Sequence, residues 1–135
     1  MSQKDLVRVR DVMKSEFDLV DGMDTVAEVL KNSKYPESKC FIVNMRHEDD
    51  EYGIVLLSDI AKQVLAKDRA PERVNIYEIM SKPVISVDPD MDIRYCTRLF
   101  ENFGLSRAPV VDNRKLVGIV GYSDIVLRGV RDNLS

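Results

Sequence analysis

Hydrophobic and polar residues follow the same order twice along this chain. The stretch Gly53-Ile54-Val55-Leu56-Leu57-Ser58-Asp59-Ile60 is an apolar run that enters Ser-Asp and then a helical pattern, and it recurs sixty-five residues later as Gly118-Ile119-Val120-Gly121-Tyr122-Ser123-Asp124-Ile125. Residues 9–13 match residues 76–80 at an offset of 67, and residues 38–44 match residues 106–112 at an offset of 68. The chain is therefore predicted to be a duplicated module with two candidate sites.

Within each copy the pattern predicts the order strand, helix, strand, strand, helix. In the first copy, Thr25 and Glu28 form a capping box, which apolar residues at helical spacing follow. Residues 41–43 and 52–56 are short apolar runs around a polar loop, and they predict a hairpin. Ser58 or Asp59 is then expected to cap the last helix of the copy.

The second copy repeats this order. Asp90 or Asp92 is expected to begin a helix that Gly104 ends. Residues 110–111 and 116–120 predict the second hairpin. Because the offset falls from 68 to 65 between the two strands of the hairpin, the first copy should carry three extra residues in its loop, where insertions are tolerated. The predicted inward face of the helix consists of Ile93, Cys96, Phe100 and Phe103.

The repeat boundaries divide the 135 residues into a first repeat at 1–67, a charged and proline-broken connector at 68–75, and a second repeat at 76–135. A unit of roughly 60 residues buries little apolar surface by itself, so the two copies are expected to share a core. The initial Met1 predicts a free-standing protein whose output passes through a separate partner.

Composition narrows the class of protein. Apolar residues at 44% and charged residues at 32% are typical of a soluble globular chain. A net charge of −3 gives no reason to expect nucleic acid or an anionic membrane as a partner. No apolar run approaches the roughly 20 residues of a membrane span. Cys40 and Cys96 are too few for a disulfide framework, which predicts a cytoplasmic protein with both thiols reduced and buried.

Taken together, these motifs resemble a tandem pair of cystathionine-β-synthase (CBS) domains, also called a Bateman module. The resemblance covers about residues 9–128 and is carried by the apolar-x-acidic-apolar-Met start of both copies, the Ser-Arg-Ala-Pro-Val-Val-Asp strand at 106–112, and the Gly-Ile-Val-x-x-Ser-Asp-Ile end of both copies. It implies an α/β (α+β) fold of two β-α-β-β-α repeats about a pseudo-two-fold axis, and frequent pairing of two chains into a flat disc. It also implies sites for adenine-containing ligands in the cleft between the repeats.

The site motif of that family, Gly-apolar-x-Thr-x-x-Asp, is matched in part. Asp59 and Asp124 stand at the aspartate position, where the carboxylate accepts bonds from both ribose hydroxyls. The threonine position is Leu56 in the first copy and Gly121 in the second. Because glycine leaves room and free backbone N–H groups, the Asp124 site is favoured. The alternative is that the two Ser-Asp pairs only cap helices.

The resemblance also assigns contacts to phosphate and to adenine. Lys39 and Arg107 are basic residues at matched positions, suited to phosphate, with a solvated surface charge as the alternative for each. The helix expected to begin at Ser123-Asp124 adds N–H donors. Tyr122 either covers the ligand or packs in the core. The full set of predicted ligand-binding residues is Asp124, Ser123, Tyr122, Gly121, Arg107, Ala108, Pro109, Ser86, Val87, Asp59, Ser58, Lys39 and Cys40.

The other polar and sulfur-containing residues predict neither a catalytic centre nor a metal site. The single histidine, His47, lies in an acidic loop, so no Ser-His-Asp or Cys-His set is available. Residues 47–51 are better explained as a solvated hairpin tip than as a cation site. Met13 and Met80 close matched apolar stretches and are expected to fill an interface.

Two functions follow from these patterns. The first is a regulatory module that binds an adenine nucleotide, AMP foremost and then ADP or ATP, and signals as a homodimer to an unknown protein effector by a population shift. The second is a ligand-free dimerisation or scaffold module with degenerate sites, which the loss of both threonines would allow. No catalytic cofactor is predicted, and an enzyme is the least expected class.

Overall fold

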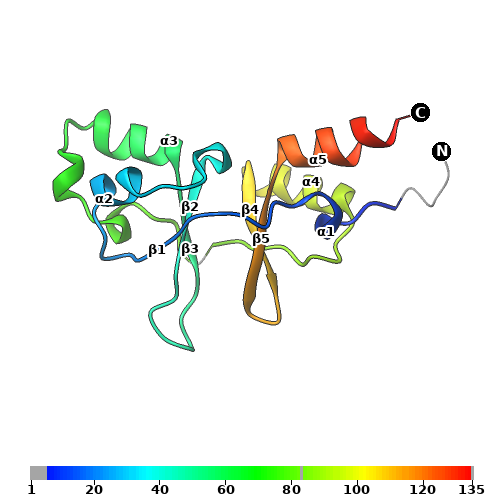
Figure 1. Ribbon diagram of the computed structural model, residues 1–135, viewed down its shortest axis with the longest axis horizontal. Coiled ribbons are helices and arrows are strands. Elements are labelled where there is room, and N and C mark those ends of the chain that lie inside the picture. The colour runs from blue at the N-terminus through cyan, green and yellow to red at the C-terminus, as the bar shows by residue number, and fades with distance from the viewer. Residues whose placement is uncertain (1–5, 83, 135) are drawn as a thin grey trace. The chain divides into compact units, whose positions relative to one another are not determined.

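A computed structural model describes residues 6–82 and 84–134 of the chain (Figure 1). These residues form two compact units. The first-copy unit runs from Phe17 to Val84, and the second-copy unit joins the described residues up to Glu16 to those from Ile85 onward. Both units combine short helices with a small sheet, so the predicted α+β class is confirmed.

The first-copy unit contains a three-stranded sheet. Its strands are β1 (Leu19–Val20), β2 (Cys40–Val43) and β3 (Gly53–Leu56), with β1 parallel and β3 antiparallel to the central β2. Its helices are α2 (Val26–Lys31) and α3 (Leu57–Ile60), which continues into the π-helical η3 (Ala61–Leu65). Three short 3-10 turns complete the unit: η2 (Pro36–Ser38), η4 (Pro71–Arg73) and η5 (Ile76–Glu78).

The predicted capping box at the start of α2 is confirmed. The Thr25 hydroxyl accepts the Glu28 N–H at 3.1 Å, and the Glu28 carboxylate accepts the Thr25 N–H at 2.8 Å. Both orphan donors are thereby satisfied. The buried apolar face of α2 then packs over the sheet in a core of Val26, Val29, Phe41, Val43, Val55, Ile60, Val64, Val74 and Ile76.

The second-copy unit contains the antiparallel hairpin β4 (Arg107–Asp112) and β5 (Lys115–Gly121). Val87 adds a parallel bridge to Val110, the counterpart of the pairing between β1 and β2 in the other unit. Its helices are α1 (Val9–Val12), α4 (Ile93–Phe103) and α5 (Tyr122–Gly129), followed by η6 (Arg131–Asn133). In Figure 1 these three α-helices lie together on one side of the hairpin.

The expected boundaries of α4 are confirmed, with one error in its inward face. Asp92 caps the helix by accepting the Arg94 N–H at 2.8 Å, and Gly104 ends it with a left-handed φ of 66°. Phe103 was expected to face inward but is 61% exposed. After the Gly104 turn, Leu105 returns with its N–H bonded to the Phe100 carbonyl and packs against the core in the place expected for Phe103.

The compact units differ from the two sequence copies, because the segment that begins each copy packs with the hairpin of the other copy. In the second-copy unit, Lys14 and Ile119 exchange backbone hydrogen bonds of 2.8 and 2.9 Å. In the first-copy unit, Ser81 and Ile54 exchange bonds of 2.9 and 3.0 Å. Each segment therefore extends the edge of a sheet to which its own copy does not contribute.

Two matched glycines allow these segments to approach the hairpins. A Cβ on Gly118 would lie 2.7 Å from the Lys14 carbonyl oxygen and 2.9 Å from the Met13 sulfur. A Cβ on Gly53 would lie 3.1 Å from the Met80 sulfur. The two methionines fill these contacts, as the sequence predicts. A side chain at either glycine would push the segment off the strand.

The strand registers correct the alignment of the two hairpins. Val43 pairs with Gly53, and Val110 pairs with Gly118, so Val43 corresponds to Val110 at an offset of 67. A bulge shifts the register of the second hairpin between Val110 and Val111. Residues beyond the bulge match the first copy in sequence at an offset of 68 instead of 67. The expectation of three extra residues in the first loop is therefore wrong, and the difference is two. No helix among residues 6–82 and 84–134 is long and apolar enough to cross a membrane.

Candidate functional site

The two candidate aspartates lie in the first turn of their helices. The residue before each helix is Leu56 or Gly121, so the expectation that Ser58 or Asp59 would be the cap residue is wrong in position. Asp59 accepts the Leu56 N–H at 2.8 Å, and Asp124 accepts the Gly121 N–H at 2.9 Å, each through Oδ2. Because a carboxylate offers about four acceptor positions, this capping bond leaves capacity for a ligand hydroxyl.

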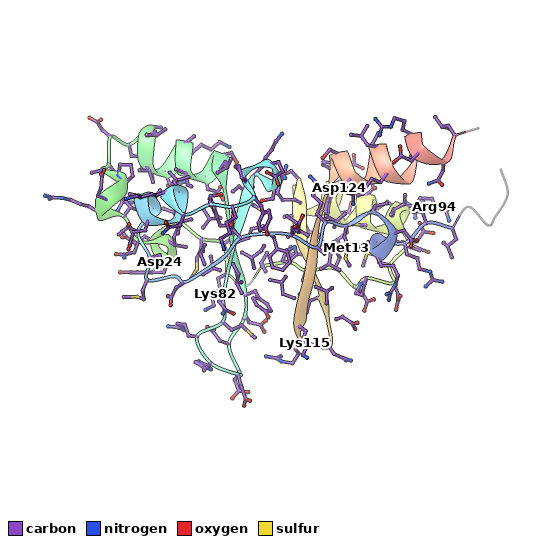
Figure 2. The ribbon with its side chains drawn as sticks, viewed as in Figure 1. Met13, Asp24, Lys82, Arg94, Lys115 and Asp124 are labelled. Carbon is purple, nitrogen blue, oxygen red and sulfur yellow. The ribbon has the colours of Figure 1, made fainter. Side chains whose placement is uncertain are left out.

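Asp124 has a cationic partner that the sequence did not predict. The Lys14 ammonium lies 3.7 Å from Asp124 Oδ1, and Asp124 is 8% exposed. Figure 2 labels Asp124 at the start of α5 and Met13, the residue before Lys14, beside β5. Lys14 reaches this position because its backbone is paired with Ile119, two residues before Gly121. The only signal in the sequence is that Lys14 directly follows a matched methionine.

Arg107 also lies at this place. It pairs with Gly121 across the β4–β5 ladder, and its Nη1 atom is 3.7 Å from where a Cβ on Gly121 would stand. The absence of a side chain at Gly121 thus leaves space under the guanidinium. We call the set of Lys14, Arg107, Gly121 and Asp124 the β5–α5 junction. It combines one buried carboxylate with two cationic side chains.

The same register gives the first-copy unit a different set of residues. Cys40 pairs with Leu56, so a buried cysteine stands where the other unit has Arg107. Ser81 pairs with Ile54 and stands where the other unit has Lys14. Around Asp59 there is accordingly one carboxylate and no counterpart of either cation.

The predicted match between Lys39 and Arg107 is wrong by one position. The Lys39 carbonyl accepts the Leu57 N–H at 3.0 Å, just as the Ser106 carbonyl accepts the Tyr122 N–H at 3.3 Å. Lys39 therefore corresponds to Ser106. It also has a left-handed φ of 62° as the residue that ends η2, whereas Ser106 and Arg107 lead directly into β4. The bulge in the second hairpin again explains why the sequence match is shifted.

One of the two residues assigned to adenine on the edge strand uses its backbone groups to hold the fold. The Val87 N–H donates to the Pro109 carbonyl at 3.0 Å, and the Val87 carbonyl accepts the Val111 N–H at 3.0 Å. Val87 is buried by this bridge, whereas Ser86 is exposed. Ala108 is fully buried next to Pro109, so it contributes a wall of the site.

Tyr122 takes the packing role that the sequence left as one of two alternatives. Its ring meets Phe100 edge to face, with centroids 5.3 Å apart and an interplanar angle of 81°. It remains 38% exposed, and the neighbouring Ser123 is exposed as well. Ser58 is likewise exposed in the first-copy unit. Both serines therefore stand beside their aspartates with accessible hydroxyls.

Two buried carboxylates of the first-copy unit serve its loops. Asp50 accepts the Lys82 ammonium at 2.6 Å and the Arg46 N–H at 2.9 Å, and these bonds hold the pKa of Asp50 well below its usual range. Asp18 accepts the Ser33 hydroxyl and two N–H groups of the following loop. The tip at 47–51 was expected to be solvated, and Asp50 is instead buried. In the described part of the chain, no three His, Cys, Asp or Glu side chains are grouped to hold a metal.

A cavity of about 820 Å³ opens beside β1 and α2 in the first-copy unit. Asp18 lines it, as do Asp21, Asp24 and Glu28. Glu28 is the residue that closes the capping box, and the Asp21 carboxylate accepts the Met23 N–H. None of the predicted ligand-binding residues lines this cavity. Its carboxylates are engaged in holding the local backbone.

Comparisons with known proteins agree with the fold and with the motifs. The family model described as "CBS domain" matches residues 76–130. The hexameric CBS-CP12 protein from bloom-forming cyanobacteria is 35% identical, with a TM-score of 0.87, over 92% of this chain and 72% of that one. This chain belongs to the CBS-domain family, and it is a tandem pair of such domains.

Two further relatives extend the comparison. The CBS domain pair of protein MJ0100, solved in complex with 5′-methylthioadenosine and S-adenosyl-L-methionine, is 25% identical with a TM-score of 0.74, over 90% of this chain and 94% of that one. The uncharacterized protein MK0525 of Methanopyrus kandleri is 36% identical over 63% of this chain and 44% of that protein. The chain spans between 15% and 44% of the length of the first three curated relatives.

Proposed function

We propose that this chain is a regulatory module that binds an adenine-containing ligand at the β5–α5 junction and signals by a change in conformation. The observation that carries the proposal is that Lys14 lies beside the buried carboxylate of Asp124, while Arg107 lies beside Gly121, whose N–H that carboxylate accepts. A carboxylate suits a vicinal diol, and two cations suit a phosphate. A ribose phosphate supplies both groups at a fixed separation.

The base is assigned to the edge formed by Ser86 and Ala108. Adenine presents an exocyclic donor beside a ring acceptor, whereas guanine reverses this pattern and would leave buried polar groups unpaired. The complex of MJ0100 supports an adenosine-type ligand for this family. Neither ligand in that complex carries a phosphate, and S-adenosylmethionine is a sulfonium cation. Because Lys14 and Arg107 favour an anion, we assign AMP to this chain first and then ADP or ATP.

We assign the change in conformation a protein effector that shares the cellular compartment of this chain. A ligand shifts a conformational equilibrium only by its difference in affinity for the two states. The effector would therefore recognise the state that AMP prefers. Cys40 and Cys96 are both buried thiols, which favours the reducing cytoplasm. We assign the chain a regulatory and not a catalytic role.

The second candidate function is a ligand-free dimerisation module. It is favoured by the apolar residues that α5 and the residue after it leave in solvent, namely Tyr122, Val126, Leu127 and Val130. Adjacent exposed apolar side chains on one helix mark a surface for association. The same surface would form a homodimer in the sensing module. The two functions therefore differ in whether a nucleotide binds, and not in whether chains associate.

A thermal-shift and calorimetry series tests the choice. AMP, ADP, ATP, GMP, 5′-methylthioadenosine and S-adenosylmethionine are titrated into the purified chain. Binding at 100 times Kd should stabilise the fold by about 2.7 kcal/mol. We expect AMP to bind most tightly and S-adenosylmethionine least among the adenine compounds. Equal affinity for AMP and GMP, or no stabilisation by any compound, would leave the dimerisation module as the function.

A further inference from the structure

The proposed nucleotide site holds an ion pair of the protein itself. The Lys14 ammonium lies 3.7 Å from Oδ1 of Asp124, the carboxylate assigned to ribose. Because Asp124 is 8% exposed, hydroxyls that bind it compete with this ammonium for the little carboxylate surface that is open. We propose that Lys14 is a latch, paired with Asp124 in the empty site and transferred to the ligand's anionic group when a nucleotide binds. This inference rests on the proposed function and names how the same site selects its ligand.

The structure confines the motion of the latch to one side chain. The Lys14 N–H and carbonyl are both bonded to Ile119, at 2.8 and 2.9 Å. The carbonyls of Val12 and Met13 accept the Arg128 guanidinium at 3.2 and 3.0 Å, which holds the preceding segment. The Lys14 side chain is 33% exposed, so its ammonium reaches solvent. A flexible four-carbon stem on a fixed backbone suits an ammonium that exchanges partners.

The latch discriminates between nucleosides and nucleotides. A neutral nucleoside that takes Asp124 leaves the partly buried Lys14 ammonium without its anion. A partly buried charge that loses its counter-ion raises the free energy of that complex. A nucleotide supplies a replacement anion for the Lys14 ammonium. The junction therefore selects a ligand that carries a vicinal diol and an anion together.

The first-copy unit provides the internal contrast. Ser81 occupies the place of Lys14, and its backbone is paired with Ile54 in the same way. A serine is too short to reach the Asp59 carboxylate as a lysine does, and it carries no charge. Replacing Lys14 by serine thus copies into the second-copy unit a residue that this fold already accommodates at the equivalent position.

The test compares adenosine with AMP in three proteins: wild type, Lys14→Ser, and Lys115→Ser as the matched control, a change at an exposed lysine at the start of β5. By isothermal titration, Lys14→Ser should bind adenosine more tightly than wild type does. The preference for AMP over adenosine should fall by about tenfold or more, because a charge-assisted bond to phosphate is lost. Lys115→Ser should change neither affinity. An unchanged preference in Lys14→Ser, or equal weakening of both ligands, would overturn the latch.

A measurement without ligand tests the empty state. Lys14→Ser, Asp124→Asn and the double variant are compared by thermal unfolding, since the asparagine carbonyl can still accept the Gly121 N–H. The latch requires that the two shifts in Tm be non-additive, and additive shifts would contradict it. If wild type binds neither AMP nor adenosine, the proposed function fails, and the latch fails with it. If wild type binds AMP and only the preference test fails, the proposed function stands without the latch.

Discussion

The Lys82 ammonium lies 2.6 Å from the Asp50 carboxylate, and this pair joins the segment after Met80 to the β2–β3 loop of the first-copy unit. The Asp50 side chain is 9% exposed and the Lys82 side chain 18%. Arg46 adds a backbone N–H to the same carboxylate. The loop that looks solvated in the sequence therefore has a fixed anchor at its end. Figure 2 labels Lys82 beside the base of this hairpin.

Lys82→Met should destabilise the protein, because it leaves the Asp50 carboxylate with less compensation for its burial. We expect Tm to fall by roughly 5 °C, with Asp49→Asn in the same loop as a control of little effect. Differential scanning calorimetry provides the measurement. An equal change in both variants would mean that the ion pair contributes nothing measurable.

The contribution of Asp50 should depend on pH. Its folded pKa lies below the unfolded value, so the stabilisation is complete above the unfolded pKa of about 4 and is lost as the pH falls through the folded pKa. The difference in Tm between wild type and Asp50→Asn should therefore be constant near neutral pH and shrink in acid. A difference that grows on acidification would contradict the assigned direction.

Gly118→Ala should be more destabilising than Gly53→Ala. The added Cβ would lie 2.7 Å from the Lys14 backbone carbonyl in the first case, and 3.2 Å from the Ser81 backbone carbonyl in the second. Because the overlap with the backbone is more severe at Gly118, we expect a loss of about 1–3 kcal/mol for Gly118→Ala. Gly22→Ala, whose Cβ would make contacts of 3.5 Å, is the control. Urea unfolding of the three variants gives the order.

Asp124→Ala should weaken AMP binding by about ten- to a hundredfold, or about 1.4–2.8 kcal/mol. Asp59→Ala should have the smaller effect, because its surroundings lack counterparts of Lys14 and Arg107. Arg107→Ala should weaken AMP more than adenosine. Calorimetry on the three variants measures these changes, and circular dichroism verifies that each retains its helices. A dominant effect of Asp59→Ala would reverse the ranking of the two sites.

Val126→Glu should disrupt self-association. Val126 is 54% exposed on α5, so the change places a charge on the apolar surface without entering the core. Light scattering coupled to size exclusion should report a smaller mass than wild type across the micromolar range. Asn102→Glu, at an exposed position of α4, serves as the control and should leave the mass unchanged. A wild type that is already monomeric would remove the basis of this prediction.

The thiols should be unreactive in the folded protein. Burial raises the pKa of the Cys96 thiol to about 11, so little thiolate is present at pH 8. Cys40 is 2% exposed within β2. A colorimetric thiol reagent should therefore react slowly with the native chain and rapidly in concentrated guanidinium chloride. A fast native reaction that is absent in Cys40→Ser would locate accessibility at that residue.

The features predicted correctly from sequence are those set by neighbours in the chain. The Thr25–Glu28 box, the Asp92 cap and the Gly104 stop each depend on residues within a few positions, and all three are confirmed. Phe103 has the spacing of a core residue, but Leu105 competes for the same place after a turn that periodicity does not describe. Local rules place helices well and their last residues less well.

The features missed from sequence depend on contacts between distant segments. A bulge at Val110 shifts one hairpin against the other by a single residue, which is enough to exchange the apparent partners of Arg107. The proximity of Lys14 to Asp124 follows from the exchange of the starting segments between copies, which a repeat alignment does not reveal. The Ser-Asp motif points to Asp124 and gives no sign of the Lys14 ammonium beside it.

The exchange of starting segments also sets an order of events during synthesis. The first-copy unit is one continuous stretch, Phe17–Val84, and its contacts can all form before residues 85–134 leave the ribosome. Residues 6–16 are made earlier, but their partner strand is β5. Because roughly a hundred residues separate Lys14 from Ile119, this pairing forms late in translation. Lys14 is thus made before the first-copy unit and placed after it. The β5–α5 junction, with its carboxylate and two cations, assembles only after α5 has been translated.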